Sequence, residues 1–157
     1  MSEALLMERL HFAKGLDPVA DAFAATVVSD VINMKNLHRV LFLVYAGVGA
    51  TGSSTFTVEA CDDVVPTNVV AIPHHSRLIA AGDTEGDITA RAAAGHIPAV
   101  GSSKLIAIEV REDALAASGF GYVRLKAVES VDSPVLGSIL VIGESKIPGA
   151  TKPTAIV

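Results

Sequence analysis

The sequence predicts an all-β fold, an antiparallel β-sandwich or jelly-roll-like single domain, and three observations lead to this prediction. Six short segments are rich in β-branched and apolar residues that alternate or cluster as they do in strands. Turn-forming Gly, Pro and Asp residues separate these segments. No stretch has the length and period of a long amphipathic helix, so the strands are expected to form sheets that pack face to face.

The predicted strands differ in how many of their faces are apolar. The segment 39–46 is apolar on both faces, which indicates a strand that is central in the sandwich or covered by another chain. The segments 55–60 and 122–128 alternate apolar with polar residues, so one face points to the core. The remaining strands are predicted at 69–72, 105–110 and 135–142. The side chains expected in the core are Phe42, Phe56, Val58, Val123 and Leu125.

The chain divides into three predicted parts. Residues 1–36 are expected to form an N-terminal arm, 37–142 the β-sandwich domain, and 143–157 an extended C-terminal tail. Both ends mix apolar residues with Gly and Pro breaks, and we expect them to contact other subunits. An alternative for the first part is an initial strand and loop of the same domain. Residues 74–100 are predicted to be a long irregular surface loop.

Composition excludes several classes of function. The 157 residues carry a formal charge of −5 and no cluster of Lys or Arg, which disfavours binding to nucleic acid. No run of about 20 apolar residues predicts a membrane span, and the first residues lack the basic start of a secretory signal. Half of the residues are hydrophobic and only 18% are charged. This balance is typical of a subunit that buries part of its surface against neighbours.

A glycine motif follows the segment 39–46. Gly47-Val-Gly-Ala-Thr-Gly52 matches the dinucleotide-binding pattern G-x-G-x-x-G, which requires a helix to begin at the glycines. Thr55, Phe56, Thr57 and Val58 come next, and their alternation predicts a strand instead. We therefore expect the glycines to form a hairpin connection that binds no nucleotide.

Several polar residues suggest chemistry, but each has a simpler structural interpretation. The pair His74-His75, with His96 further along the chain, is the best metal-like group, but no second ligand pair has zinc-site spacing. His75, Ser76 and Asp83 include the residue types of a hydrolase triad, but a nucleophile elbow is absent from the sequence.

Other acidic residues and the single cysteine are also expected to be structural. Asp62-Asp63, Glu85 and Asp87 lack the calcium-loop pattern and are typical of turns and strand ends. Cys61 is expected to be a half-buried residue at a strand end. The cations Arg124 and Lys126 are expected to pair with Glu59 on an adjacent strand. The sequence thus predicts no catalytic, cofactor or metal site and no enzyme activity.

Three blocks resemble small virion proteins of tailed bacteriophages. They are Ser29-Asp-Val-Ile-Asn-Met-Lys-Asn36, Phe56-Thr-Val-Glu-Ala-Cys-Asp-Asp63 and Phe120-Gly-Tyr-Val-Arg-Leu-Lys126. The similarity covers roughly residues 29–142 and consists of strand and turn motifs. It implies a structural role, most directly that of a head decoration or cement protein, and supplies no catalytic residues.

The expected partners follow from this resemblance. A decoration protein binds the major capsid protein, self-associates as a homo-oligomer such as a trimer, and is located on the capsid surface after synthesis in the host cytoplasm. The alternatives are a neck or tail component, or a small lectin-like host-attachment module. The low aromatic content, 4%, disfavours the lectin-like alternative.

Overall fold

The computed structural model describes residues 5–49, 51–80, 82–99, 102–149 and 151–156. Some predicted features extend outside these ranges. They are residues 1–4 of the predicted arm, residue 50 of the glycine motif, residues 81 and 100 of the predicted loop, and residues 150 and 157 of the predicted tail.

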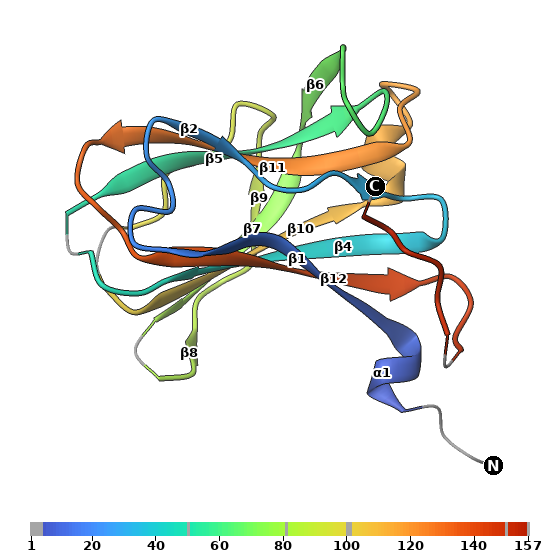
Figure 1. The fold of residues 1–157 in the computed structure, drawn as a ribbon, viewed down its shortest axis with the longest axis horizontal. Helices are drawn as coiled ribbons and strands as arrows, with labels where there is room; N and C mark the ends of the chain where they lie inside the picture. Colours follow the sequence, from blue (N-terminus) through green and yellow to red (C-terminus); the bar gives the residue numbers. More distant parts are fainter. Residues whose placement is uncertain (1–4, 50, 81, 100–101, 150, 157) are drawn as a thin grey trace.

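Two antiparallel sheets pack face to face, which confirms the predicted all-β sandwich (Figure 1). Within the described residues, sheet A has seven strands and sheet B has five. Across sheet A the strands are β1 (Leu10–Val19), β12 (Gly137–Ser145), β4 (Leu37–Ala46), β10 (Lys104–Arg111), β7 (His74–Ala80) and β8 (Thr84–Glu85), with β9 (Thr89–Arg91) also paired to β7. Across sheet B they are β2 (Thr26–Val28) and β3 (Ile32–Asn33), both paired to β11 (Tyr122–Val131), then β5 (Ser53–Cys61) and β6 (Val69–Ile72). Helical structure is limited to α1 (Leu6–Arg9) and a 3₁₀ turn, η1 (Glu112–Leu115).

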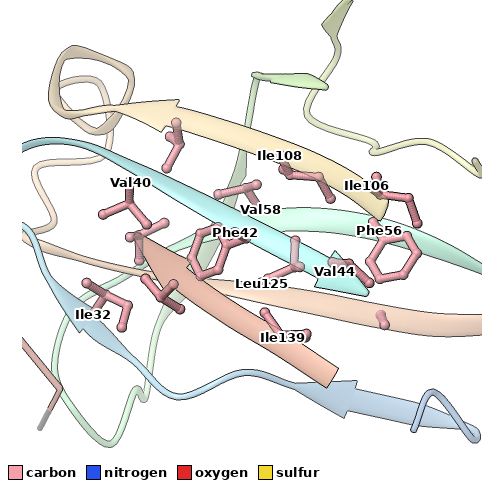
Figure 2. Close-up of a cluster of buried hydrophobic side chains, with 14 of the residues drawn as sticks. Ile32, Val40, Phe42, Val44, Phe56, Val58, Ile106, Ile108, Leu125 and Ile139 are labelled. Carbon is pink, nitrogen blue, oxygen red and sulfur yellow. The ribbon is translucent and has the colours of Figure 1, made fainter. Parts of the chain in front are cut away.

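The core lies between the two sheets, as Figure 2 shows. Because successive side chains of a strand point to opposite faces, alternate residues of β4 project inward and meet those of β5 and β11. The five predicted core residues are all buried, so the strand register inferred from the sequence is confirmed. Phe56 also packs edge-on against Phe23, with ring centroids 5.5 Å apart.

The N-terminal segment differs from the predicted arm, because most of it belongs to the two sheets. β1 pairs with β12 from Leu10 to Val19, while β2 and β3 pair with β11. Gly15 is buried against β12, where an added Cβ would lie 3.0 Å from the side chains of Ile139 and Val141. The expected boundary at residue 36 therefore does not separate an arm from the sandwich. The alternative, a first strand of the same domain, describes residues 10–33 better.

β1 was not recognised as a strand from the sequence, because it contains residues that are typical of sheet edges. Lys14, Gly15 and Pro18 interrupt its apolar pattern, and its pairing with β12 shifts register twice. Charged residues, prolines and bulges are common on edge strands, because they discourage pairing with other chains. The same residues that signalled a break in the sequence are thus compatible with an edge strand.

The C-terminal segment folds back onto sheet B. β12 continues to Ser145, past the predicted strand end at residue 142. Further on, the amide of Asn33 donates to the carbonyl of Ala155 at 2.7 Å, and Ile156 forms a β-bridge with Ile32. The last described residues therefore have partners within the same chain.

The segment 74–100 is more regular than predicted, because β7, β8 and β9 lie within it. β7 runs beside β10 from Glu109↔His75 to Leu105↔Ile79. Its inward residues include His74 and Ser76, which are polar although they face the core. Polar residues at inward positions remove the alternation by which a strand is recognised from sequence.

The glycine motif connects two sheets rather than two paired strands. β4 belongs to sheet A and β5 to sheet B, so residues 47–52 pass from one sheet to the other and the predicted hairpin is wrong. The prediction that a strand follows the glycines is confirmed by β5. Two apolar strands separated by a short glycine loop cannot be assigned to one sheet or to two from their sequence alone.

Replacing the buried Phe56 tests the core packing. Phe56→Ala is expected to lower the free energy of unfolding by about 3–5 kcal/mol, because it removes an aromatic ring from a closely packed interior. Urea unfolding followed by circular dichroism measures the change. Val65→Ala, at an exposed position, is the control and should alter stability by less than about 0.5 kcal/mol. Equal effects of both substitutions would contradict the packing.

Two truncations test the place of β1 in the sandwich. Deleting residues 1–9 removes α1 and leaves all strands, so cooperative unfolding should persist. Deleting residues 1–20 also removes β1, uncovers the edge of β12 and exposes the core contacts of Ala13 and Leu16. The longer deletion is expected to abolish cooperative thermal unfolding or lower its midpoint strongly. A midpoint equal to that of the shorter deletion would mean that β1 contributes nothing to the fold.

Candidate functional site

The outer face of sheet A has a band of apolar side chains from five neighbouring strands, and the same rows also contain Lys14, Glu109 and Arg77. Cα pairing aligns its outward residues in rows: one row contains Phe12, Ile142 and Leu41, and the next contains Leu140, Leu43 and Ala107. A third row contains Tyr45, Leu105 and Ile79. We call these nine residues the outer apolar face. They come from β1, β12, β4, β10 and β7, five strands that are adjacent only in the folded sheet.

Three of these nine side chains are exposed to solvent, and the other six are partly buried. Phe12 is 54% exposed, Tyr45 53% and Leu140 49%, while the inward residues of the same strands are buried. From first to last Cα the rows extend roughly 19 Å across the five strands and roughly 14 Å along them, because strands lie about 4.8 Å apart and outward residues of one strand about 6.8 Å apart. Exposed apolar patches of a few hundred Å² are often functional.

The two outer faces of the sandwich have opposite character. On sheet B, the outward residues of β5 and β11 include Thr55, Thr57, Glu59, Arg124 and Lys126. Both Arg124 and Lys126 contact Glu59, at 2.7 Å and 3.2 Å, which confirms the predicted cross-strand pairing. Charged and hydroxyl side chains thus dominate the outer face of sheet B, where Val28, Val69 and Val128 are also exposed, whereas apolar side chains predominate on that of sheet A.

A groove of about 710 Å³ lies over the half of the outer apolar face formed by β4, β10 and β7. Its floor includes Leu41, Leu43 and Leu105. One wall is formed by the segment after β7, through residues such as Asp83 and Ile88. Ile88 is 65% exposed, so the wall itself presents an apolar side chain.

The charges at the edge of this face are paired with one another. The guanidinium of Arg39 lies 2.6 Å from Glu144 and 3.6 Å from Glu109, and Arg77 contacts Glu85. Lys14 contacts Asp17 at 2.8 Å. These pairs leave little uncompensated charge to attract a strongly charged ligand, so burial of apolar surface is the main interaction that the face offers.

The adjacent histidines that resemble a metal pair in the sequence point in opposite directions. His74 is buried on the inner side of β7, whereas His75 is exposed on the outer side. His96, from the segment after β9, lies against His74 with ring centroids 5.6 Å apart. Among the residues described, no group of three or more His, Cys, Asp or Glu side chains could hold a metal ion.

The three triad-type residues His75, Ser76 and Asp83 all line the groove, but alternation along β7 turns the side chain of Ser76 inward. Ser76 is buried and accepts a hydrogen bond of 2.8 Å from Nε of Arg91, while His75 is on the opposite face of β7. Asp83 lies on the wall of the groove. The three side chains therefore do not share one face of the sheet.

Asp62 and Cys61 have structural roles at the end of β5. The carboxylate of Asp62 accepts hydrogen bonds from the backbone and side chains of Thr67 and Asn68, and these bonds, that of the Asn68 side chain first, lower its pKa to about 2. Burial raises the pKa of the Cys61 thiol to about 11, which keeps it protonated at neutral pH. Cys61 is fully buried rather than half-buried as predicted.

The backbone of the glycine motif contacts other segments of the same chain. The amide of Gly47 donates to the carbonyl of Leu136 at 2.6 Å, and that of Gly49 donates to Oγ of Ser102 at 3.2 Å. A Cβ added at Gly52 would lie 2.3 Å from the carbonyl oxygen of Ser133. The glycines thus permit close packing against residues 133–135, and two of the amides that would bind a phosphate already have acceptors.

Sequence reasoning identified part of the outer apolar face. The two-sided apolar pattern of β4 correctly indicated a central strand, and cover of its outer face by another chain stays a prediction. The contributions of Phe12 and Ile79 were missed, because their strands were assigned to the arm and to the irregular loop. The alternation in Leu10-His-Phe-Ala13 could have indicated a strand, but it would have assigned Phe12 to the core face, whereas Phe12 lies on the outer face.

Comparisons with known proteins add one weak likeness. No protein-family model and no curated protein matches the sequence. A chain from the structure of infectious bursal disease virus Gx strain is similar, with 12% identity and a TM-score of 0.25. The match covers 90% of this chain but only 42% of the viral chain. A likeness at this TM-score carries no argument about function. In the described part of the chain, no helix is long and apolar enough to cross a membrane.

Substitutions of two glycines test whether the motif is structural. Gly52→Ala should lower the free energy of unfolding by about 1–3 kcal/mol, because the new methyl group would collide with residues 133–135. Gly121→Ala is the control, since a Cβ there meets nothing within 4 Å. Denaturant unfolding measures both. NAD or ATP should leave the melting temperature of the wild-type chain unchanged, and stabilisation by either would contradict the structural role.

Proposed function

We propose that this chain is a structural protein of a virion, of the head-decoration or cement type, and that it binds the major capsid protein through the outer apolar face. The observation that carries the proposal is the contrast between the two faces of the sandwich. A five-stranded apolar surface opposite a charged one is typical of a subunit that docks on a larger assembly.

The sequence blocks that resemble phage virion proteins support the same proposal from another part of the molecule. They contain β3, β5 and the start of β11, which are neighbours in sheet B. Ser29, in the first block, joins them: its Oγ accepts from the amide of Leu125 at 2.9 Å. The quoted blocks therefore lie together in sheet B, and the proposal assigns the contact with the capsid protein to the outer face of sheet A.

The proposal assigns no catalytic step to the chain. The polar residues that could take part in catalysis either lie apart or are held in structural hydrogen bonds. His75 and Ser76 point to opposite faces of β7, and the carboxylate of Asp62 accepts hydrogen bonds within a turn. Binding to a lattice requires only shape and apolar burial, and many identical copies on one shell add their contributions. The groove beside the outer apolar face would accept a protruding apolar segment of the capsid protein.

The N-terminal residues provide a second proposed contact, between copies of this chain in a homo-oligomer such as a trimer. Leu5, Leu6 and Met7 are exposed, and α1 extends away from the sandwich (Figure 1). Exposed apolar residues at a chain end are suited to packing on a neighbour. The proposed location is the capsid surface, after synthesis in the host cytoplasm.

Binding to assembled shells of the major capsid protein from the same genome tests the proposed function. Leu140→Asp, in the outer apolar face, should weaken binding at least about 10-fold, because burial of a leucine side chain contributes about 1.5–3 kcal/mol. Val128→Asp, at an exposed position on β11 of sheet B, is the matched control and should bind as the wild type does. Co-sedimentation with quantified copy number measures both.

The design separates the possible failures. Thermal unfolding confirms that each variant is folded, and Phe12→Ser provides a second substitution in the outer apolar face if Leu140→Asp is unstable. Absence of wild-type binding to shells, with a few copies per particle at the neck or tail instead, would replace decoration by a neck or tail role. Equal binding of the Leu140 and Val128 variants would exclude the outer apolar face.

A further inference from the structure

One edge of the sandwich is closed by the segment 92–99, which we call the strap. It follows β9 in sheet A and crosses to β5 in sheet B. There the amide of Phe56 donates to the carbonyl of His96 at 2.9 Å, and the amide of His96 donates to the carbonyl of Phe56 at 3.1 Å. Gly95 makes this approach possible with a φ of +82°, since a Cβ there would lie 2.2 Å from the carbonyl oxygen of Phe56.

The imidazole of His96, on the strap, packs against the imidazole of His74. His74 comes from β7 and is only 3% exposed, and its ring lies 5.6 Å from that of His96 at a tilt of 44°. Nδ1 of His74 is 3.3 Å from the carbonyl oxygen of Ile72, so this nitrogen is assigned the proton and Nε2 is left as an acceptor. Among the described residues, neither Nε2 of His74 nor Nδ1 of His96 has a hydrogen-bond partner.

The surroundings of the pair disfavour positive charge. The positive charge of Arg91 on β9 acts on both rings, and His75 is next to His74 on β7. Glu59, the acid on β5, is bonded to Arg124 and Lys126 and does not act on either ring. Burial first, and the charge of Arg91 after it, lower the pKa of both histidines, that of His96 to about 4.

We infer that the strap is an acid-sensitive latch: the neutral His74–His96 pair holds it closed, and protonation of the pair releases residues 92–99 from β5. The strap is connected along the chain to the segment that borders the outer apolar face. The strap continues from β9, and the residues just before β9 form the wall of the groove. Release would therefore loosen that wall and regulate docking, a consequence that rests on the proposed function.

The direction of the pH dependence follows from the lowered pKa values. A histidine that binds a proton less readily in the closed state than in the open state, where its pKa is near 6.5, favours closure at neutral pH. Closure is at its strongest above about pH 6.5 and weakens as the pH falls toward 4. For His96 alone, the ratio of open to closed strap rises by at most about 300-fold, which is ten raised to the difference between 6.5 and 4.

Hydrogen exchange on the free wild-type chain tests the latch without any partner. At pH 7.5 the amide of His96 should be protected, and at pH 4.5 its protection should fall by at least 10-fold after correction for the intrinsic pH dependence of exchange. The turn at residues 62–68 is an internal control. Its carboxylate, Asp62, has a pKa of about 2, so its protection should not change over this range.

Two variants and one titration complete the test. His96→Phe should reduce the pH dependence of strap protection to the part that comes from His74, whereas His75→Gln, on the opposite face of β7, should behave as the wild type does. If His96→Phe does not fold, His74→Gln replaces it. NMR titration of the wild-type His96 ring should give a pKa well below 6.5.

The outcomes distinguish the latch from the docking proposal. Equal strap protection at both pH values, or a His96 ring that titrates near 6.5, would overturn the latch and leave binding to capsid shells unaffected as a separate question. A pH-dependent strap combined with no wild-type binding to shells would support the latch and reject the proposed function.

Discussion

The two-sided apolar character of β4 is the constraint on which the rest of the structure depends. Its inward residues Val40, Phe42 and Val44 are completely buried, and they fix how sheet A packs on sheet B. Its outward residues lie at the centre of the outer apolar face, between the side chains of β12 and β10. One strand thus specifies both the interior of the subunit and the surface through which we propose that it docks.

The polar groups of the sandwich are organised around this apolar layer. Glu59 is buried, and it is stable there because Arg124 and Lys126 provide charge-assisted contacts on the same face of sheet B. On sheet A, Arg39 joins Glu109 and Glu144 at the border of the outer apolar face. Charge is therefore balanced locally on both outer faces, and within the described residues the larger apolar area in contact with water lies on sheet A.

The histidine pair packs at the edge of the sandwich that the strap closes. His74 and His96 fill space between the sheets without a carboxylate to stabilise their charged forms. They consequently contribute to packing as neutral rings and become unfavourable when protonated. An edge closed by groups of this kind is well packed at neutral pH and sensitive to acid, which a purely apolar closure would not be.

The sequence by itself determined the fold class, the strands with regular alternation and the core residues that they contribute, because side-chain period is a local property of the chain. The ion pairs of Glu59 with two cations of the adjacent strand were also predicted correctly, because residues on one face of adjacent strands meet when the sheet forms. Only the tertiary structure decided that β1 is an edge strand, that β4 and β5 belong to different sheets, and that His74 meets His96. These features depend on contacts between residues far apart in the chain, and neither Lys14 and Pro18 in β1 nor the inward His74 in β7 follows the pattern that marks a strand. The outer apolar face exists for the same reason: its rows are assembled by pairing between strands, and no single segment of sequence contains them.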